Sequence, residues 1–316
     1  MEKFPTDDAA REHLERLRWP NGPACPKCGS AEVYRLTRKA ESTRGCRAGL
    51  LKCKYCRKQF TVTVGTVMED SHIPLRKWVI AMYMLCCSKK GISAHQIHRM
   101  LGLSYKSAWF LMHRVRFAMT EPAMREKLYG VIEADEAYIG GKRNRGRRIP
   151  RGEGGPAGRP AADSPMRPVF ALVQRNGDVR SFHVQRVTAD TLRRVLKENV
   201  HEDSAIVTDE LNVYGPACED FGSHETVNHS KGEYVRHGNV HTNTIEGYFG
   251  LLKRGINGIY HHVGAHHLHR YLAEFDFRYN SRKMKDGART EMAVRGIEGK
   301  RLKYRDSSKT ARTASL

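Results

Sequence analysis

The sequence predicts a multidomain α+β protein built from three kinds of unit. Two closely spaced cysteine pairs near the N-terminus indicate a small metal-bound unit. Helical patterns then dominate residues 67–125, and alternating strand and helix patterns over residues 126–290 indicate an α/β domain with a mixed sheet. At 316 residues, the chain is long enough for two or three domains, each with its own core.

The expected boundaries follow changes in pattern and composition. They are a helical lead-in (1–22), the cysteine unit (23–66), the helical unit (67–125), the α/β domain (126–290) and a basic flexible tail (291–316). Within the α/β domain, residues 142–168 are rich in Arg, Gly and Pro, a composition that cannot form a core. We expect an extended insert there, which either follows a phosphate backbone or acts as a solvated spacer.

The chain is strongly basic. Its 55 Lys and Arg residues outnumber 34 Asp and Glu residues, for a formal net charge of +21. This balance favours a polyanionic partner, most simply nucleic acid. The sequence shows no membrane span and no signal peptide, so we expect a cytoplasmic protein that does not bind membranes. Cysteines in that compartment call for an explanation other than disulfides.

Four cysteines have the spacing of a zinc site. Cys25 and Cys28 lie in C-P-K-C-G, and Cys53 and Cys56 lie in C-K-Y-C-R. Two such turns close a tetrahedron of thiolates around one Zn²⁺, which predicts a zinc ribbon. Four thiolates leave no open position, so we expect a structural ion, with binding worth roughly 10–16 kcal/mol. Basic residues around the ribbon fit contact with DNA, and contact with another protein is the alternative.

The helical unit has the pattern of a helix-turn-helix. Residues 73–90 predict one helix, and residues 91–119 predict two more on either side of Gly-Leu-Ser. Ser93 and Ser104 are the expected N-caps. A short helix, a tight turn with Gly and a longer helix match the layout of this DNA-binding motif, although a plain helical hairpin has the same pattern. The expected DNA contacts on the second helix are Tyr105, Lys106, Ser107 and Arg114.

Acidic residues occur in three elements of the α/β domain. The strand G-V-I-E-A-D-E-A-Y-I-G-G (130–141) carries Glu133 and Asp135 on one face and Glu136 on the other. A hairpin (169–187) and a helix (188–200) precede a buried strand within 204–214 that ends at Asp209. A later helix, 243–254, contains Glu246. This order is the layout of an RNase H-like domain, in which three carboxylates converge from distant positions.

Converging carboxylates indicate a divalent cation. Two of them about 4 Å apart repel by roughly 4 kcal/mol at an effective dielectric constant of 20. Two Mg²⁺ or Mn²⁺ ions would remove this repulsion and create a phosphoryl-transfer site, because oxygen ligands suit these hard ions. The residues alone leave Glu133 and Glu136 open beside Asp135, and Glu210 open beside Asp209.

Polar residues on the last helix complete the predicted site. Lys253 lies two helical turns after Glu246 on the same face, where its amine can contact a phosphate. Arg254 is a further candidate for DNA contact. Asn243 either assists a metal-bound water or caps the helix. A histidine cluster over residues 261–269 is interpreted as packed or phosphate-contacting rather than as a metal site.

The chain resembles a known family along most of its length. The motifs are F-P-T-D…L-R-W-P-N-G-P-A-C-P-K-C-G (4–29), I-E-A-D-E-A-Y-I-G-G (132–141), V-T-D-E-L-N-V-Y (207–214), H-T-N-T-I-E-G-Y-F-G-L-L-K-R-G-I (241–256) and E-F-D-F-R-Y-N-S-R (274–282). They are similar to those of bacterial insertion-sequence transposases with an N-terminal zinc ribbon and a DDE catalytic domain, the ISXO-like group related to Merlin elements.

The resemblance implies site residues and an activity. It assigns the two aspartates to Asp135 and Asp209, the third ligand to Glu246 and the family's lysine to Lys253. Relatives can carry Asn at the third position, which keeps Asn243 as a candidate. The implied activity is metal-dependent cutting and joining of double-stranded DNA at the terminal inverted repeats of a mobile element.

The implied partners are the terminal repeats, the target DNA and a second copy of the chain, because two element ends must be brought together. The expected setting is the bacterial cytoplasm, in association with the nucleoid. Two other functions remain open: a DNA-binding regulator with an idle acid cluster, and a nuclease that cuts without joining.

Overall fold

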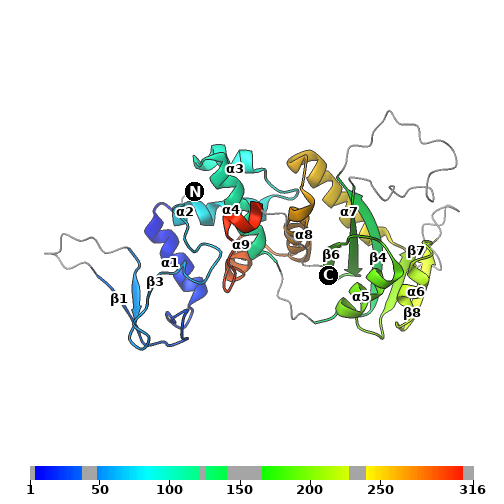
Figure 1. Ribbon diagram of the computed structural model, residues 1–316, viewed down its shortest axis with the longest axis horizontal. Coiled ribbons are helices and arrows are strands. Elements are labelled where there is room, and N and C mark those ends of the chain that lie inside the picture. Colours follow the sequence, from blue (N-terminus) through cyan, green and yellow to red (C-terminus); the bar gives the residue numbers. More distant parts are fainter. Residues whose placement is uncertain (1–3, 38–47, 121–125, 141–165, 228–239, 309–316) are drawn as a thin grey trace. The chain divides into compact units, whose positions relative to one another are not determined.

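The computed structural model contains two compact units (Figure 1). The first takes its described residues from both ends of the chain, 4–120 and 283–308, and the second takes them from 126–282. Within these limits, the described ranges are 4–37, 48–120, 126–140, 166–227 and 240–308. No helix in them combines the length and apolar character needed to cross a membrane.

The first unit begins with a helix and a small sheet. Helix α1 (Asp7–Arg18) starts at its N-cap Thr6, whose hydroxyl accepts a hydrogen bond from Ala9 N (3.2 Å). Strands β1 (Val33–Arg35), β2 (Leu51–Cys53) and β3 (Gln59–Phe60) pair antiparallel in that order. The buried residues of this sheet are few (Leu51, Phe60 and two cysteines), so the apolar core alone is small.

Three helices follow the small sheet. They are α2 (Leu75–Cys87), α3 (Ala94–Leu101) and α4 (Tyr105–Ala118). Both predicted N-caps are confirmed, because Ser93 Oγ accepts from Gln96 N and Ser104 Oγ accepts from Ser107 N, each at 3.1 Å. Gly102 adopts φ 56°, the left-handed conformation that glycine permits at a helix C-terminus. Helices α3 and α4 therefore form a hairpin with a tight turn.

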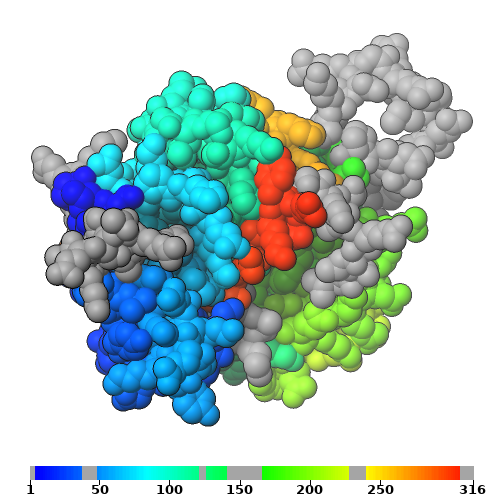
Figure 2. Space-filling view, turned by 60° about the vertical axis from the view of Figure 1, so that its left-hand side comes forward, coloured from blue at the N-terminus to red at the C-terminus, as the bar shows by residue number. Residues whose placement is uncertain are grey.

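The C-terminal segment corrects two predictions. We expected the α/β domain to extend to residue 290 and a flexible tail to follow, but α9 (Asp286–Arg295) and α10 (Tyr304–Ser308) belong to the first unit. Helix α9 packs against α1, α2 and α4, and Figure 2 shows the red C-terminal residues against the blue-green surface of α4. Because this segment is rich in charged residues, its few apolar residues were not recognised as part of a core. The buried ones among them are Ala293, Val294, Ile297 and Leu302.

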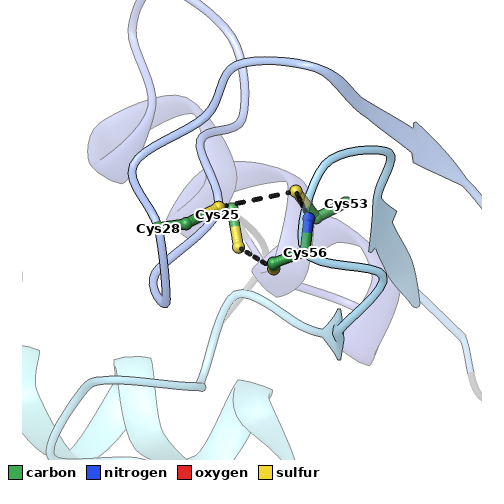
Figure 3. A group of neighbouring side chains, drawn as sticks. All are labelled: Cys25, Cys28, Cys53 and Cys56. Atoms are coloured by element: carbon green, nitrogen blue, oxygen red, sulfur yellow. Dashed lines mark hydrogen bonds between the residues drawn. The ribbon is translucent and has the colours of Figure 1, made fainter.

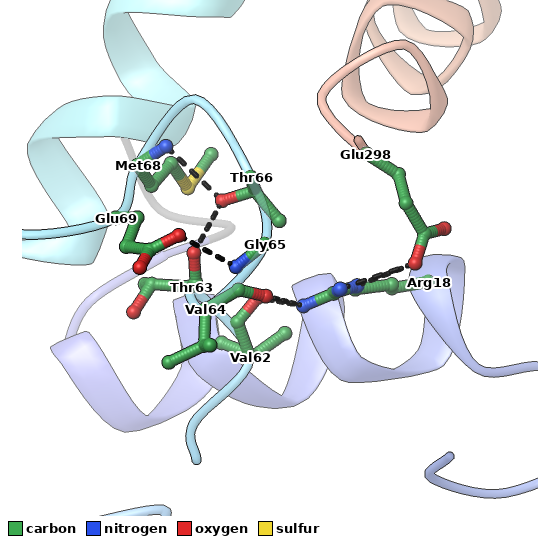
Figure 4. A network of polar contacts seen from close by, with 9 residues as sticks. All are labelled: Arg18, Val62, Thr63, Val64, Gly65, Thr66, Met68, Glu69 and Glu298. Carbon is green, nitrogen blue, oxygen red and sulfur yellow. Dashed lines mark hydrogen bonds and ion pairs between the residues drawn. The ribbon is translucent and has the colours of Figure 1, made fainter. Parts of the chain in front are cut away.

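Polar contacts also hold the C-terminal segment to the N-terminal helix. Arg18 donates to the carbonyl oxygens of Val62 and Val64 (2.7 and 2.8 Å) and pairs with Glu298 (3.1 Å), as Figure 4 shows. Lys300 Nζ donates to the carbonyl oxygen of Ala118 (2.9 Å) at the end of α4. The first unit is therefore completed by residues that follow the second one in the sequence.

The second unit is built on the predicted mixed sheet. Its strands are β4 (Val131–Ile139), β5 (Arg167–Gln174), β6 (Val179–His183), β7 (Ala205–Asp209) and β8 (Ser223–Val227), in the spatial order β6-β5-β4-β7-β8. Strand β5 pairs antiparallel with β4 and β6, whereas β7 runs parallel to β4 and β8. The predicted hairpin is confirmed, with Asn176 at φ 60° in its turn.

Helices cover both faces of this sheet. Helices α5 (Ala189–Asn199) and α6 (Tyr214–Cys218) pack against one face, with Ile132 and Ala134 of β4 in the shared core. Helices α7 (Asn243–Gly255) and α8 (Ala265–Asn280), joined through a π-helical turn (Ile256–Tyr260), pack against the other with Ala137 and Ile139. Alternate residues of β4 therefore face different helices, as the strand period requires.

One expected limit in the second unit is confirmed and another changes. The strand predicted within 204–214 ends at Asp209 as expected, since β7 spans Ala205–Asp209 and α6 begins at Tyr214. Leu211 N donates to Asp209 Oδ1 (3.1 Å), a side-chain turn that ends the strand. The predicted insert 142–168 lies outside the described residues up to 165, and Arg167 and Pro168 belong to β5.

Candidate functional site

The four predicted zinc ligands lie together. Cys25 and Cys28 precede β1, and Cys53 and Cys56 lie at the end of β2 and after it (Figure 3). The Sγ atoms of Cys25 and Cys56 are 3.6 Å apart, as are those of Cys28 and Cys53, and all four lie within 4.8 Å of one another. Tetrahedral Zn–S bonds of about 2.3 Å require sulfur atoms about 3.8 Å apart, so this donor set fits a structural Zn²⁺.

Asp135 and Asp209 lie on neighbouring parallel strands. The register of β4 and β7 pairs Glu133 with Val207, so Asp135 and Asp209 follow two residues later at the same level. Adjacent strands are about 4.8 Å apart, which places the two aspartates side by side at one end of the strand pair. Both side chains are half-buried.

Glu246 lies in the first turn of α7, on the face of the sheet toward which Asp135 points. The pKa of the Asp135 carboxyl is raised well above its ordinary value, first by burial and then by the carboxylates of Glu136, Asp209 and Glu246. The structure therefore brings the three predicted ligands into one electrostatic group. Among the described residues, only the cysteines form a group of three or more donors within 4.8 Å, so the acid group is the more open of the two.

Hydrogen bonds to nearby residues orient these acids. Asp135 Oδ1 accepts from the backbone N–H of Glu136 (2.7 Å), and Asp209 Oδ1 accepts from that of Leu211 (3.1 Å). The Thr242 hydroxyl donates to Glu246 Oε1 (3.3 Å). All three acids are thus held by local contacts, and a carboxylate set of this kind suits Mg²⁺ or Mn²⁺.

The acids beside Asp135 lie in different surroundings. Glu133 is fully buried and bonds to the first turn of α7. Glu136 points to the opposite face, where its Oε2 accepts from the Tyr214 hydroxyl (2.6 Å). Burial, followed by the charges of Glu136 and Asp135, raises the pKa of Tyr214 well above its ordinary value, so the phenol stays protonated. Glu210 is exposed next to Asp209.

The polar residues predicted on α7 are exposed. Lys253 follows Glu246 by seven residues, about 10.5 Å along the same helix face. Arg254 is also exposed, with its guanidinium near Gly250. Asn243 is the exposed first residue of α7, and the N-cap is Thr242. The alternative in which Asn243 caps the helix is therefore not observed.

The predicted DNA-contacting residues of α4 divide into two groups. Tyr105 and Lys106 are exposed in the first turn, and the Tyr105 ring stacks on His95 with centroids 4.2 Å apart. Ser107 is half-buried there, and its N–H and hydroxyl bond to Ser104. The predicted DNA contact of Arg114 is wrong, because only 5% of the surface of this residue is exposed. Its guanidinium packs over Trp78 and donates to the carbonyl oxygen of Glu69.

Two functional neighbours were missed by sequence reasoning. Arg175, just after β5, pairs with Glu133 (Nε to Oε1, 2.9 Å), and Tyr214 bonds to Glu136. A buried carboxylate requires a cation, but nothing in the pattern indicates which of the many basic residues supplies it. The histidine cluster contributes no three-donor group among the described residues. Burial first, and then nearby cations, lower the pKa of His269 to about 4, so it is neutral at neutral pH.

Comparisons with known proteins identify the class. Residues 127–280 match the ISXO2-like transposase domain, and residues 5–59 match the transposase zinc-ribbon domain. A protein of Halobacterium salinarum, described as an uncharacterized protein in transposable element ISH50, is 31% identical over 283 residues, which cover 88% of this chain and 92% of that protein. The chain belongs to the ISXO2-like family of DDE transposases, which are polynucleotidyl transferases with an N-terminal zinc ribbon.

One solved structure is also similar. It is a chain of the cryo-EM structure of the simian T-cell lymphotropic virus intasome in complex with PP2A regulatory subunit B56 gamma. That chain is 15% identical, with a TM-score of 0.29, and the match covers 57% of this chain and 63% of that one.

Proposed function

We propose that this transposase binds the terminal inverted repeats of its mobile element and catalyses metal-dependent DNA strand cleavage and strand transfer. The observation that supports the proposal is that Asp135 and Asp209 lie level on neighbouring strands while Glu246 opens the helix on the face toward which Asp135 points. We further propose that the second unit is an RNase H-like domain, because its strand, hairpin, helix, strand and late helix follow that order.

The acids supply the chemistry. Asp135, Asp209 and Glu246 would hold two Mg²⁺ or Mn²⁺ ions, which supply charge neutralisation and Lewis-acid activation at the scissile phosphate when bound. The raised pKa of Asp135 supports this assignment, since its causes are burial and like charges that a cation would offset. Lys253 and Arg254 lie exposed on the same helix and would bind phosphates beside the scissile bond, with Asn243 positioned to hydrogen-bond there.

The first unit would recognise the DNA. Tyr105, Lys106 and Ser107 open α4, the position from which a helix-turn-helix contacts base edges and phosphates. In the ribbon, Lys27, Arg57 and Lys58 are exposed and would contact phosphates. Bringing two element ends together requires at least two copies of the chain, so we propose a homo-oligomer on DNA.

An end-cleavage and joining assay tests the proposal. A labelled duplex with the terminal repeat is incubated with the protein in Mg²⁺, Mn²⁺ or EDTA, for the wild type, Asp209→Asn and the neighbouring control Glu210→Gln. We expect metal-dependent cutting at the repeat boundary and joining to target DNA, abolished by Asp209→Asn and retained by Glu210→Gln. Binding without cutting would support a regulator, and cutting without joining would support a nuclease.

A further inference from the structure

The N-terminus of α7 lacks its usual local cap. A helix leaves its first four N–H groups without intrahelical partners, and an N-cap threonine normally accepts from one of them. Thr242 occupies the N-cap position, but its hydroxyl accepts no bond from these N–H groups and is turned to Glu246, to whose Oε1 it donates (3.3 Å). The first turn, which carries Glu246, therefore requires an acceptor from elsewhere.

Glu133 of β4 provides that acceptor. Its Oε2 accepts from the backbone N–H groups of Thr244 (2.9 Å) and Ile245 (3.0 Å), and its Oε1 accepts from the Thr244 hydroxyl (2.8 Å). A negative charge at this end also interacts favourably with the helix dipole. One side chain of the central strand thus performs the capping role for a helix far along the chain.

Glu133 is in no position to act directly on substrate. Its side chain is 0% exposed, and both of its oxygens already accept hydrogen bonds. Arg175 Nε contacts Oε1 (2.9 Å), and the same guanidinium donates to the carbonyl oxygen of His241 (2.8 Å), just before α7. The buried charge is thus compensated, and the contacts link the strand to the segment that enters the helix.

The position of Glu133 connects it to two of the three acids. It lies two residues before Asp135 on the same face of β4, and it binds the residues immediately before Glu246. We propose that Glu133 is a positioning residue that sets the spacing between Asp135 and Glu246, and thereby the affinity of the acid group for divalent cations. This inference rests on the proposed function of that group.

The experiment compares Glu133→Gln with Thr188→Ala in the zinc-loaded full-length protein. Thr188 caps α5, on the opposite face of the sheet, by the ordinary local bond to Thr191 N, so its loss weakens a helix that carries none of the three acids. For each variant, strand cleavage is measured against Mg²⁺ concentration, and affinity for the duplex is measured separately. Hydrogen exchange of the first-turn amides of α7 and α5 is recorded without DNA.

We expect Glu133→Gln to raise the Mg²⁺ concentration for half-maximal cleavage by about 10–100-fold, the usual effect of losing an outer contact to a metal ligand. Duplex affinity stays unchanged, and the amides of Thr244–Glu246 exchange faster. Thr188→Ala leaves the Mg²⁺ response unchanged. A wild-type Mg²⁺ response in folded Glu133→Gln protein would overturn the inference.

The exchange data separate this inference from the proposed function. If the wild type cuts no DNA in any metal, the proposed function fails. The amide exchange then still tests whether Glu133 stabilises the first turn of α7. Equal protection of the α7 amides in Glu133→Gln and the wild type would overturn that role of Glu133. Glu133→Asp, which keeps the charge but shortens the side chain, is expected to restore part of the Mg²⁺ response.

Discussion

The cysteine cluster and the acid group are both candidate metal sites, but they are assembled in different ways. The cysteines come from two turns of one small sheet, and their sulfur atoms already lie at the separations that a zinc ion requires. The acids come from β4, β7 and α7 and form a more open group. One site is specified by local spacing, whereas the other depends on how a whole domain packs.

Because of this difference, the two sites are sensitive to different substitutions. The ribbon has a small apolar core, so its order depends on the metal itself. The acid group depends on strand register and on contacts such as that of Glu133 with α7, which join segments more than 100 residues apart in the sequence. Substitutions outside the ligands should therefore matter more for the acids than for the cysteines.

Removal of zinc is expected to have the largest effect. Cys53→Ser should abolish zinc binding, unfold the ribbon and remove specific DNA binding, because the metal contributes roughly 10–16 kcal/mol in comparable sites. Cys87→Ser, a half-buried thiol of the same unit, serves as the control and should retain zinc. Zinc content by mass spectrometry and duplex affinity are the measurements. An ordered ribbon without zinc would show that its apolar core suffices.

Loss of an acid should affect only the chemistry. Glu246→Gln should slow strand cleavage by about 10³-fold, since a lost ligand removes several kcal/mol of charge stabilisation, and DNA binding should persist. Asn243→Ala should slow cleavage by at most about 100-fold, because the loss of an outer polar contact typically costs about 10–100-fold. Single-turnover cleavage rates make the comparison. A larger loss of cleavage rate in Asn243→Ala than in Glu246→Gln would show that Asn243, rather than Glu246, is the third metal ligand.

The stability of the first unit should also depend on the C-terminal segment, independently of zinc. Ile297→Ala should lower the free energy of unfolding of that unit by about 2–5 kcal/mol, because this buried side chain packs in the core. Met292→Ala, at a position that is 46% exposed, should have little effect. Urea unfolding monitored in the first unit measures both. Equal stability of the two variants would indicate that the segment adds nothing to that core.

The smallest expected effect concerns phosphate contacts. Lys253→Ala should lower the slope of log affinity against log salt by about 0.9, the contribution of one phosphate contact. Lys197→Ala, on α5 at the opposite face of the sheet, is the control and should leave the slope unchanged. Duplex affinity measured across a salt series gives both slopes. An unchanged slope in Lys253→Ala would show that this lysine makes no contact with a DNA phosphate.

The two sites also differ in how far the sequence predicts them. The cysteine pairs specify their own site because four ligands on two tight turns have one sensible arrangement. The succession of strands and helices along the chain, including the helix with Glu246, followed from hydrophobic periodicity. The residues alone could not choose among Glu133, Asp135 and Glu136, since their roles depend on which helix covers each face. Arg114 was misassigned for a related reason: a basic residue inside a helical pattern gives no sign that its guanidinium packs over a buried ring such as that of Trp78.

The C-terminal helices were missed because their partners lie at the other end of the chain. Ile297 and Leu302, which flank these helices, are isolated apolar residues in a charged segment, and only the packing of α9 against α1, α2 and α4 indicates that the segment belongs to the core of the first unit. Local periodicity carries no information about such a partner.

Iron-mediated cleavage of the protein backbone tests the central claim most directly. Fe²⁺ replaces Mg²⁺ in the zinc-loaded protein, ascorbate and peroxide generate hydroxyl radicals at the bound ion, and mass spectrometry maps the cuts. We expect cuts near Asp135, Asp209 and Glu246 that excess Mg²⁺ suppresses and that Asp135→Asn removes. Cuts confined to the histidines of 261–269, or none that respond to Mg²⁺, would contradict the claim that these three acids form the metal site.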